Sequence, residues 1–198
     1  MSKEADKFDN FMKGLAAASQ LLYLSRNKGC FIECVCLYAT IIDASLRIGI
    51  ILKHQLDNRS DIVLDELLFQ SDEDKIVSER KIYKRALISG VIDQSIFDKL
   101  ETLYKQRNKV VHRYIISEIT TKKVILIAQE YDELINLIKK RLDELEIRQI
   151  KEGIGMTKSS SEVPIEIRLN KQKMMDDMIR KKHGSDSLDD NLKRTDDF

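Results

Sequence analysis

The chain has 198 residues, of which 42% are hydrophobic and 34% are charged, so it is long enough for one good core plus an appendage but not for two full domains. Its formal net charge of +1 excludes a global positive field, and any contact with nucleic acid must therefore come from a local patch. One proline, seven glycines and apolar residues at helical spacing predict an all-α protein, an up-down helical bundle of four to six helices with a C-terminal appendage.

Two helices are predicted on either side of Gly29. Apolar residues recur at helical spacing from Glu4 to Asn27, and Gly29 follows this first helix as a C-cap. The second helix, from Phe31 to about Leu56, is apolar nearly all round, which favours a central and buried position. Its charged residues leave no uninterrupted apolar run long enough to span a bilayer. We therefore expect no membrane contact and a cytoplasmic location.

Cys30, Cys34 and Cys36 stand close together in an apolar segment, and no secretory signal precedes them. This pattern favours small buried side chains in a reducing cytosol over a disulfide or a metal site. A fourth ligand is missing nearby, since the nearest histidine is His54. We expect no bound metal and no cofactor.

A polar stripe interrupts the second helix. Glu33, Thr40, Arg47 and His54 are spaced seven apart, and Asp43 lies one turn before Arg47. The stripe is either a solvent-facing seam with an Asp43–Arg47 ion pair inside the helix, or the wall of a cleft. In the second case Glu33 or Asp43 orients a functional residue of another helix.

Shorter elements are predicted in the middle of the chain. The sequence favours a short helix over Asp61–Phe69, an acidic loop over Gln70–Lys75, and a helix that begins after Ser78 and ends before Gly90. The apolar residues of the first of these elements are expected to point inward: Ile62, Leu64, Leu67 and Leu68.

Two long helices complete the predicted bundle. Asp93 is the expected N-cap of a helix that runs to about Ile116, and Thr120 or Thr121 starts the last strong helix, which runs to roughly Glu152. The inner face of the last helix is predicted to carry Val124, Ile127, Tyr131, Leu134, Ile138, Leu142 and Leu145.

The composition changes after this helix, which predicts a bundle over residues 1–152 and a flexible linker with a partly helical tail over residues 153–198. Leu169–Lys182 is basic and rich in methionine, with Met174, Met175, Met178 and Ile179 on one side of a helix. We expect this tail to become ordered only against a partner or a second subunit. One reading is an antitoxin-like protein whose tail wraps around a toxin.

Arg107 lies in the middle of the apolar face of the helix that begins at Asp93. A buried guanidinium needs a carboxylate, a phosphate or a wet cleft, because an unpaired buried charge is costly. Asn108 and His112 share one flank of this face, and five steps along the helix turn Arg107 and His112 roughly 140° apart. An exposed basic row on the opposite face is a candidate RNA-binding surface: Lys105, Lys109 and Arg113.

These residue types suit RNA cleavage without a metal. An imidazole can take a proton from a ribose 2′-hydroxyl, and a second group can return one to the 5′ leaving oxygen. A guanidinium stabilises the more highly charged phosphorane between those steps. Since the two side chains diverge on one helix, we expect a homodimer in which a twofold partner brings a second pair to the same groove.

The string Arg107-Asn108 to His112 resembles the R-N-x-x-x-H signature of the HEPN superfamily, whose members are helical bundles. With Tyr114 it also resembles the R-x-x-x-x-H-x-Y pattern of the HepT toxins. The resemblance implies a metal-independent endoribonuclease, active as a dimer, in a toxin–antitoxin or antiviral defence system. It makes Arg107 and His112 catalytic, Asn108 supporting, and Tyr114 a candidate for AMPylation by a nucleotidyltransferase antitoxin.

The alternatives remain open. Arg107 is otherwise a core arginine paired with Glu33, Asp43 or Glu101, and His112 an edge histidine. The protein is then a non-catalytic HEPN-like module that binds a nucleotide or another protein.

Overall fold

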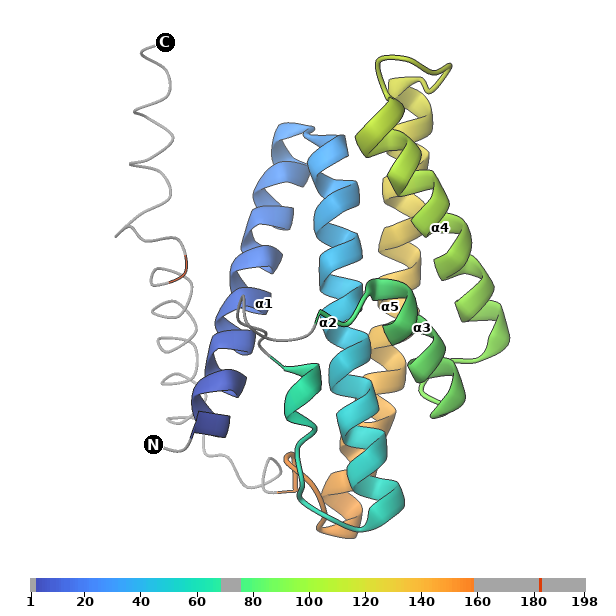
Figure 1. Ribbon diagram of the computed structural model, residues 1–198. Helices are drawn as coiled ribbons and strands as arrows, with labels where there is room; N and C mark the ends of the chain where they lie inside the picture. The colour runs from blue at the N-terminus through green and yellow to red at the C-terminus, as the bar shows by residue number, and fades with distance from the viewer. Residues whose placement is uncertain (1–2, 69–75, 159–181, 183–198) are drawn as a thin grey trace.

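The computed structural model describes residues 3–68, 76–158 and 182. Its described part contains five α-helices, one 3-10 helix and no strand, so the predicted all-α bundle is confirmed (Figure 1). The elements in chain order are α1 (Lys3–Lys28), α2 (Phe31–Asn58), η1 (Asp65–Leu67), α3 (Glu79–Ile88), α4 (Gln94–Arg113) and α5 (Thr121–Glu152).

α2 is the central helix of the bundle. It makes its most extensive contacts with α5, and α1 and α3 also pack against it (Figure 1). Gly49 permits a close approach, because a Cβ there would lie 2.7 Å from Val91 Cγ1 and 2.9 Å from Leu142 Cδ2. The predicted central and buried position of this helix is confirmed. Its fully buried side chains include Val35, Ile42, Leu46, Ile51 and Leu52.

The membrane question needs a correction. Among the described residues, α2 is the one helix that is long and apolar enough to cross a membrane by length and composition. We predicted that its charged residues exclude a membrane span, and by length and composition they do not. However, 72% of the most apolar stretch of α2 is buried inside the bundle. Its hydrophobicity is therefore accounted for by contacts with the other helices.

Capping residues fix most helix ends where the sequence predicts them. The Asp93 carboxylate accepts a hydrogen bond from the amide of Ile96 (3.0 Å), and the Thr120 hydroxyl accepts one from Lys123 (3.2 Å). Both bonds satisfy amides that have no partner within the helix. Gly29 after α1 and Gly153 after α5 have positive φ angles, as C-cap glycines do.

The predicted helix over Asp61–Phe69 is wrong. Only the 3-10 turn η1 forms, and Ile62, which was expected to point inward, is 65% exposed. The physical reason lies in α2: the buried amide of Gln55 donates to the carbonyls of both Asp61 and Ile62. These carbonyls bond to a side chain instead of to amides one turn later.

The predicted end of α4 is also wrong, because this helix ends at Arg113 and not at about Ile116. The predicted acidic loop over 70–75 lies outside the described residues.

The chain just after α5 is held by the bundle. Gln149 and Gln55 are fully buried and hydrogen-bonded to each other (2.9 Å). The amide of Met156 donates to Gln55, and the amide and hydroxyl of Thr157 donate to Gln149. Residues up to 158 thus contact the bundle, and the predicted tail helix over 169–182 lies outside the described residues except for Lys182.

Candidate functional site

Arg107 forms an ion pair with Glu79, the first residue of α3, at 2.7 Å between Nη2 and Oε2. The Tyr83 hydroxyl donates to the other oxygen of Glu79, and the Arg107 guanidinium lies 5.0 Å from the centre of the Tyr104 ring. The side chains of Arg107 and Glu79 are 21% and 18% exposed. Of the three surroundings predicted for Arg107, a carboxylate, a phosphate or a wet cleft, the structure shows a carboxylate, but none of the predicted partners Glu33, Asp43 and Glu101 supplies it.

The surroundings of the Glu79–Arg107 pair shift the pKa of the groups around it. Burial is the largest single influence on the pKa of the Arg107 guanidinium and lowers it, but the charge and hydrogen bond of Glu79 together with Tyr131 and Tyr83 raise this pKa above its ordinary value. Burial and the charge of Glu79 raise the pKa of both Tyr83 and Tyr131. Arg107 Nε and the Tyr131 hydroxyl are buried without a hydrogen-bond partner in the described part of the chain. The cluster is a polar junction of α3, α4 and α5.

Asp43 and Arg47 form a second ion pair, within α2, at 2.6 Å. Arg47 also donates to the backbone carbonyls of Leu67 (3.3 Å) and Val77 (3.1 Å), so it fastens η1 and the start of α3 to the central helix. The Asp43–Arg47 pair within one helix was one of the two predictions for the polar stripe and is confirmed. The expectation that this seam faces solvent holds only in part: Glu33 and Thr40 are exposed and His54 is half-buried, but Arg47 is only 7% exposed.

Asp43 lies near the Arg107 cluster without bonding to Arg107. Burial raises the pKa of the Asp43 carboxyl, and the negative charge of Glu79 adds to this, whereas Arg47 lowers it. One Asp43 oxygen is buried with no hydrogen-bond partner among the described residues. The residue that orients Arg107 is thus Glu79, which sequence reasoning missed.

His112 lies on the exposed surface near the end of α4, and Asn108 is half-buried. Arg107 is directed at Glu79 on α3, so the two predicted catalytic side chains are not brought together within one protomer. The predicted basic row is exposed as expected, at Lys105, Lys109 and Arg113. The end of this helix therefore presents positive charge and an imidazole to solvent.

Glu33 and Tyr114 meet elsewhere. They line a pocket of about 490 Å³ formed where the turn between α1 and α2 lies beside the start of α5. Tyr114 is half-buried, and its hydroxyl is 2.8 Å from that of Thr121. Glu33 thus lies beside the candidate modification site and makes no ion pair with Arg107.

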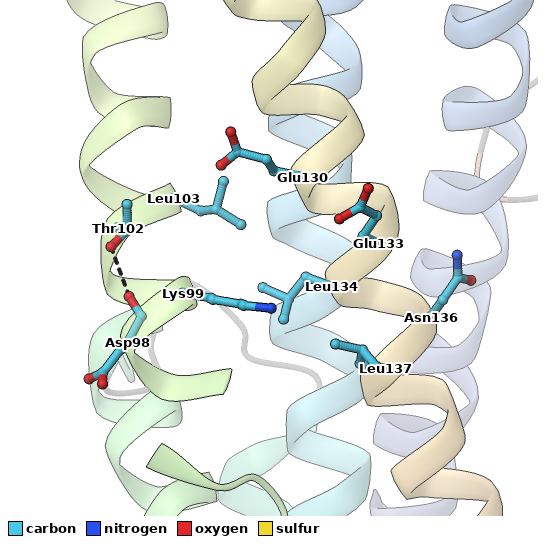
Figure 2. Close-up of a pocket in the computed structure, with 9 residues that line it drawn as sticks. All are labelled: Asp98, Lys99, Thr102, Leu103, Glu130, Glu133, Leu134, Asn136 and Leu137. Atoms are coloured by element: carbon cyan, nitrogen blue, oxygen red, sulfur yellow. Dashed lines mark hydrogen bonds between the residues drawn. The ribbon is translucent and has the colours of Figure 1, made fainter. Parts of the chain in front are cut away.

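A larger pocket of about 750 Å³ lies between α4 and α5, and sequence reasoning did not predict it. Figure 2 shows Lys99 extending across it, with Glu130 and Glu133 projecting from α5. Leu103, Leu134 and Leu137 supply its apolar lining. Because carboxylates repel phosphate, we do not assign this pocket to RNA.

The three cysteines are free thiols. Cys34 is buried as predicted, and burial, followed by the charge of Glu33, raises its pKa. Cys30 is exposed, which corrects the prediction of three buried thiols, because it occupies the turn that precedes α2. In the described part of the chain, no cluster of three or more His, Cys, Asp or Glu side chains is arranged to hold a metal ion.

Comparison with family models, with curated proteins and with solved structures gave no match to this chain. The resemblance to the HEPN superfamily thus depends on the motif and on the helical fold.

The Glu79–Arg107 pair is expected to be coupled more strongly than an exposed ion pair. In a double-mutant cycle with Glu79→Gln and Arg107→Met, we expect a coupling free energy of about 1–3 kcal/mol, because each single change leaves a polar partner poorly paired in a partly buried site. Thermal or urea unfolding of the four proteins measures it.

The matched control is the Arg80–Glu101 pair, whose arginine also lies over Tyr104 but is 51% exposed. Its coupling is expected to be clearly smaller, because solvent screens an exposed ion pair. Equal coupling in both cycles would mean that Glu79 does not hold Arg107.

Proposed function

We propose that the protein is a metal-independent endoribonuclease of HEPN type that acts as a homodimer, as a toxin or defence effector. The observation that supports this best is the end of α4, where an exposed His112 and an exposed basic row accompany a partly exposed Arg107. Positive charge on this surface attracts the RNA backbone even though the chain as a whole is nearly neutral.

In the proposed reaction, His112 takes the proton of a ribose 2′-hydroxyl, and the resulting oxygen attacks the adjacent phosphorus. The bond to the 5′ oxygen breaks, and this oxygen receives a proton from a second group in the groove. The products are a 2′,3′-cyclic phosphate and a 5′-hydroxyl. Arg107 stabilises the phosphorane between the two steps.

Glu79 restricts how Arg107 takes part. Its carboxylate accepts a hydrogen bond from Nη2, and the buried Nε has no hydrogen-bond partner among the described residues. In the proposal, Nη1 contacts the phosphate while Glu79 fixes the plane of the guanidinium. Two copies related by a twofold axis then supply an Arg107 from one subunit and a His112 from the other to a shared groove.

A second candidate function is a non-catalytic helical module that binds a nucleotide or a protein. The ion pair between Arg107 and Glu79 favours it, since an arginine with a carboxylate partner and a ring contact already has a structural role. A nucleotidyltransferase antitoxin that modifies Tyr114 fits the first proposal, and it would have to free the hydroxyl from Thr121.

Incubating the purified protein with single-stranded RNA in EDTA separates these two functions. The ribonuclease produces 2′,3′-cyclic phosphate ends and leaves the same sequence in DNA intact, because DNA lacks the 2′-hydroxyl. The absence of cleavage over a range of RNA sequences would contradict the proposal and favour the binding module.

A further inference from the structure

The first half of α1 has an incompletely covered apolar side. α1 packs mainly against α2 (Figure 1). Its apolar side chains Phe8, Phe11, Met12 and Leu15 are only half-buried. Some of this apolar surface is therefore left for another segment to cover.

A pocket of about 350 Å³ lies between α1 and α2 along this stretch. Phe11, Gly14 and Ala18 line it on α1, and Asp43 and Ala44 line it on α2. A Cβ added at Gly14 would meet no atom within 4 Å, so no described side chain fills the space above it. A glycine inside a helix costs helix stability, and here it keeps the groove deep.

Lys182 lines the same pocket, although it follows the bundle by a long stretch of chain. It is the last residue of the basic, methionine-rich segment Leu169–Lys182. If this segment is helical, Met174, Met175, Met178 and Ile179 share one side, since they are one, four and five steps apart. Methionine side chains adapt to irregular apolar grooves.

We propose that Leu169–Lys182 docks as an amphipathic helix in the α1–α2 groove of its own chain. Its methionine side lies over Gly14 and Ala18, and its basic end lies toward Asp43, whose buried oxygen has no partner among the described residues. Fourteen helical residues span about 21 Å, which is enough to cover the stretch from Phe8 to Ala18. The occupant follows from the position of Lys182, the last residue of this segment, in the pocket.

Hydrogen exchange of the full-length chain, followed by mass spectrometry, tests this docking. In the parent protein, amides of 172–182 are expected to exchange at least about tenfold more slowly than in an unfolded chain, because helical hydrogen bonds protect them. Met178→Asp with Ile179→Asp should abolish this protection and speed exchange in α1 between Phe8 and Ala18. Asp177→Asn, on the polar side of the segment, should leave both unchanged.

Gly14→Leu tests the groove itself. The added side chain fills the open space and improves helix propensity, so α1 stays folded while the tail is released. Circular dichroism checks that the helix content is retained. Unprotected 172–182 amides in the parent, or protection that survives Gly14→Leu, would overturn the proposal. Protection that appears only at concentrations where the chain dimerises would assign the groove to a second copy and overturn docking within one chain.

Discussion

Arg107→Ala and His112→Ala are each expected to lower the rate of RNA cleavage by about 10²–10⁴-fold, with the helical fold retained. Loss of the imidazole removes the base that deprotonates the 2′-hydroxyl. Loss of the guanidinium removes the charge that stabilises the phosphorane. Arg107→Lys should be little more active than Arg107→Ala. A planar guanidinium can contact Glu79 with one edge and a phosphate with another, whereas an ammonium group cannot. Single-turnover cleavage of a labelled RNA in EDTA measures these rates.

Two matched variants serve as controls. Arg80→Ala removes an arginine that lies over the same Tyr104 ring, and His54→Ala removes a half-buried histidine on α2. Both should cleave RNA at rates within about twofold of the parent, because neither side chain has a role in the proposed reaction and an exposed charge such as Arg80 mainly tunes encounter with RNA. If Arg107→Ala or His112→Ala cleaved as fast as these controls, the assignment of the site would be wrong.

Arg47→Met is expected to reduce the free energy of unfolding by about 3–5 kcal/mol at pH 7–8. The change keeps an unbranched apolar stem but removes the guanidinium and leaves the Asp43 carboxylate without its cation. It also removes the hydrogen-bond donor of the Leu67 and Val77 carbonyls, which accept from Arg47. Urea unfolding followed by circular dichroism measures the difference.

The loss should be smaller at acidic pH. Burial already raises the pKa of Asp43, whereas Arg47 lowers it, so removing Arg47 moves this pKa further up. Below the new pKa the folded variant holds a neutral Asp43 and no longer buries an unpaired charge, so its stability rises relative to the parent as the pH falls.

Arg85→Met is the matched control, since Arg85 forms an exposed ion pair with Glu66 of η1, with side chains 40% and 53% exposed. It should cost at most about 1 kcal/mol. A comparable loss in both variants, or a loss at Arg47 that does not depend on pH, would contradict the role given to the Asp43–Arg47 pair.

Local signals explain what could be predicted of the fold. The caps at Asp93 and Thr120 and the glycine at Gly153 act on amides and carbonyls within one turn, so they can be read from a short stretch of sequence. The inner face of α5 follows from the helical period, and every side chain predicted on it is buried.

The remaining features depend on contacts between distant segments. The failed helix over Asp61–Phe69 depends on Gln55, whose amide holds the backbone of that segment. The partner of Arg107 comes from α3, and no local pattern distinguishes Glu79 from the other acidic residues of the chain. The need for a carboxylate, a phosphate or a wet cleft was predictable from the burial of a guanidinium, whereas which of these it meets follows from how the helices pack.

The central claim is that Arg107 and His112 act together across two copies of the chain. It is tested most directly by mixing the inactive Arg107→Ala and His112→Ala proteins, unfolding them together and refolding them as mixed dimers. The account predicts that cleavage returns to about a quarter of the parent rate, since half of the dimers are mixed and each has one intact composite site. Mixed dimers that form but cleave no faster than either variant alone would contradict the claim.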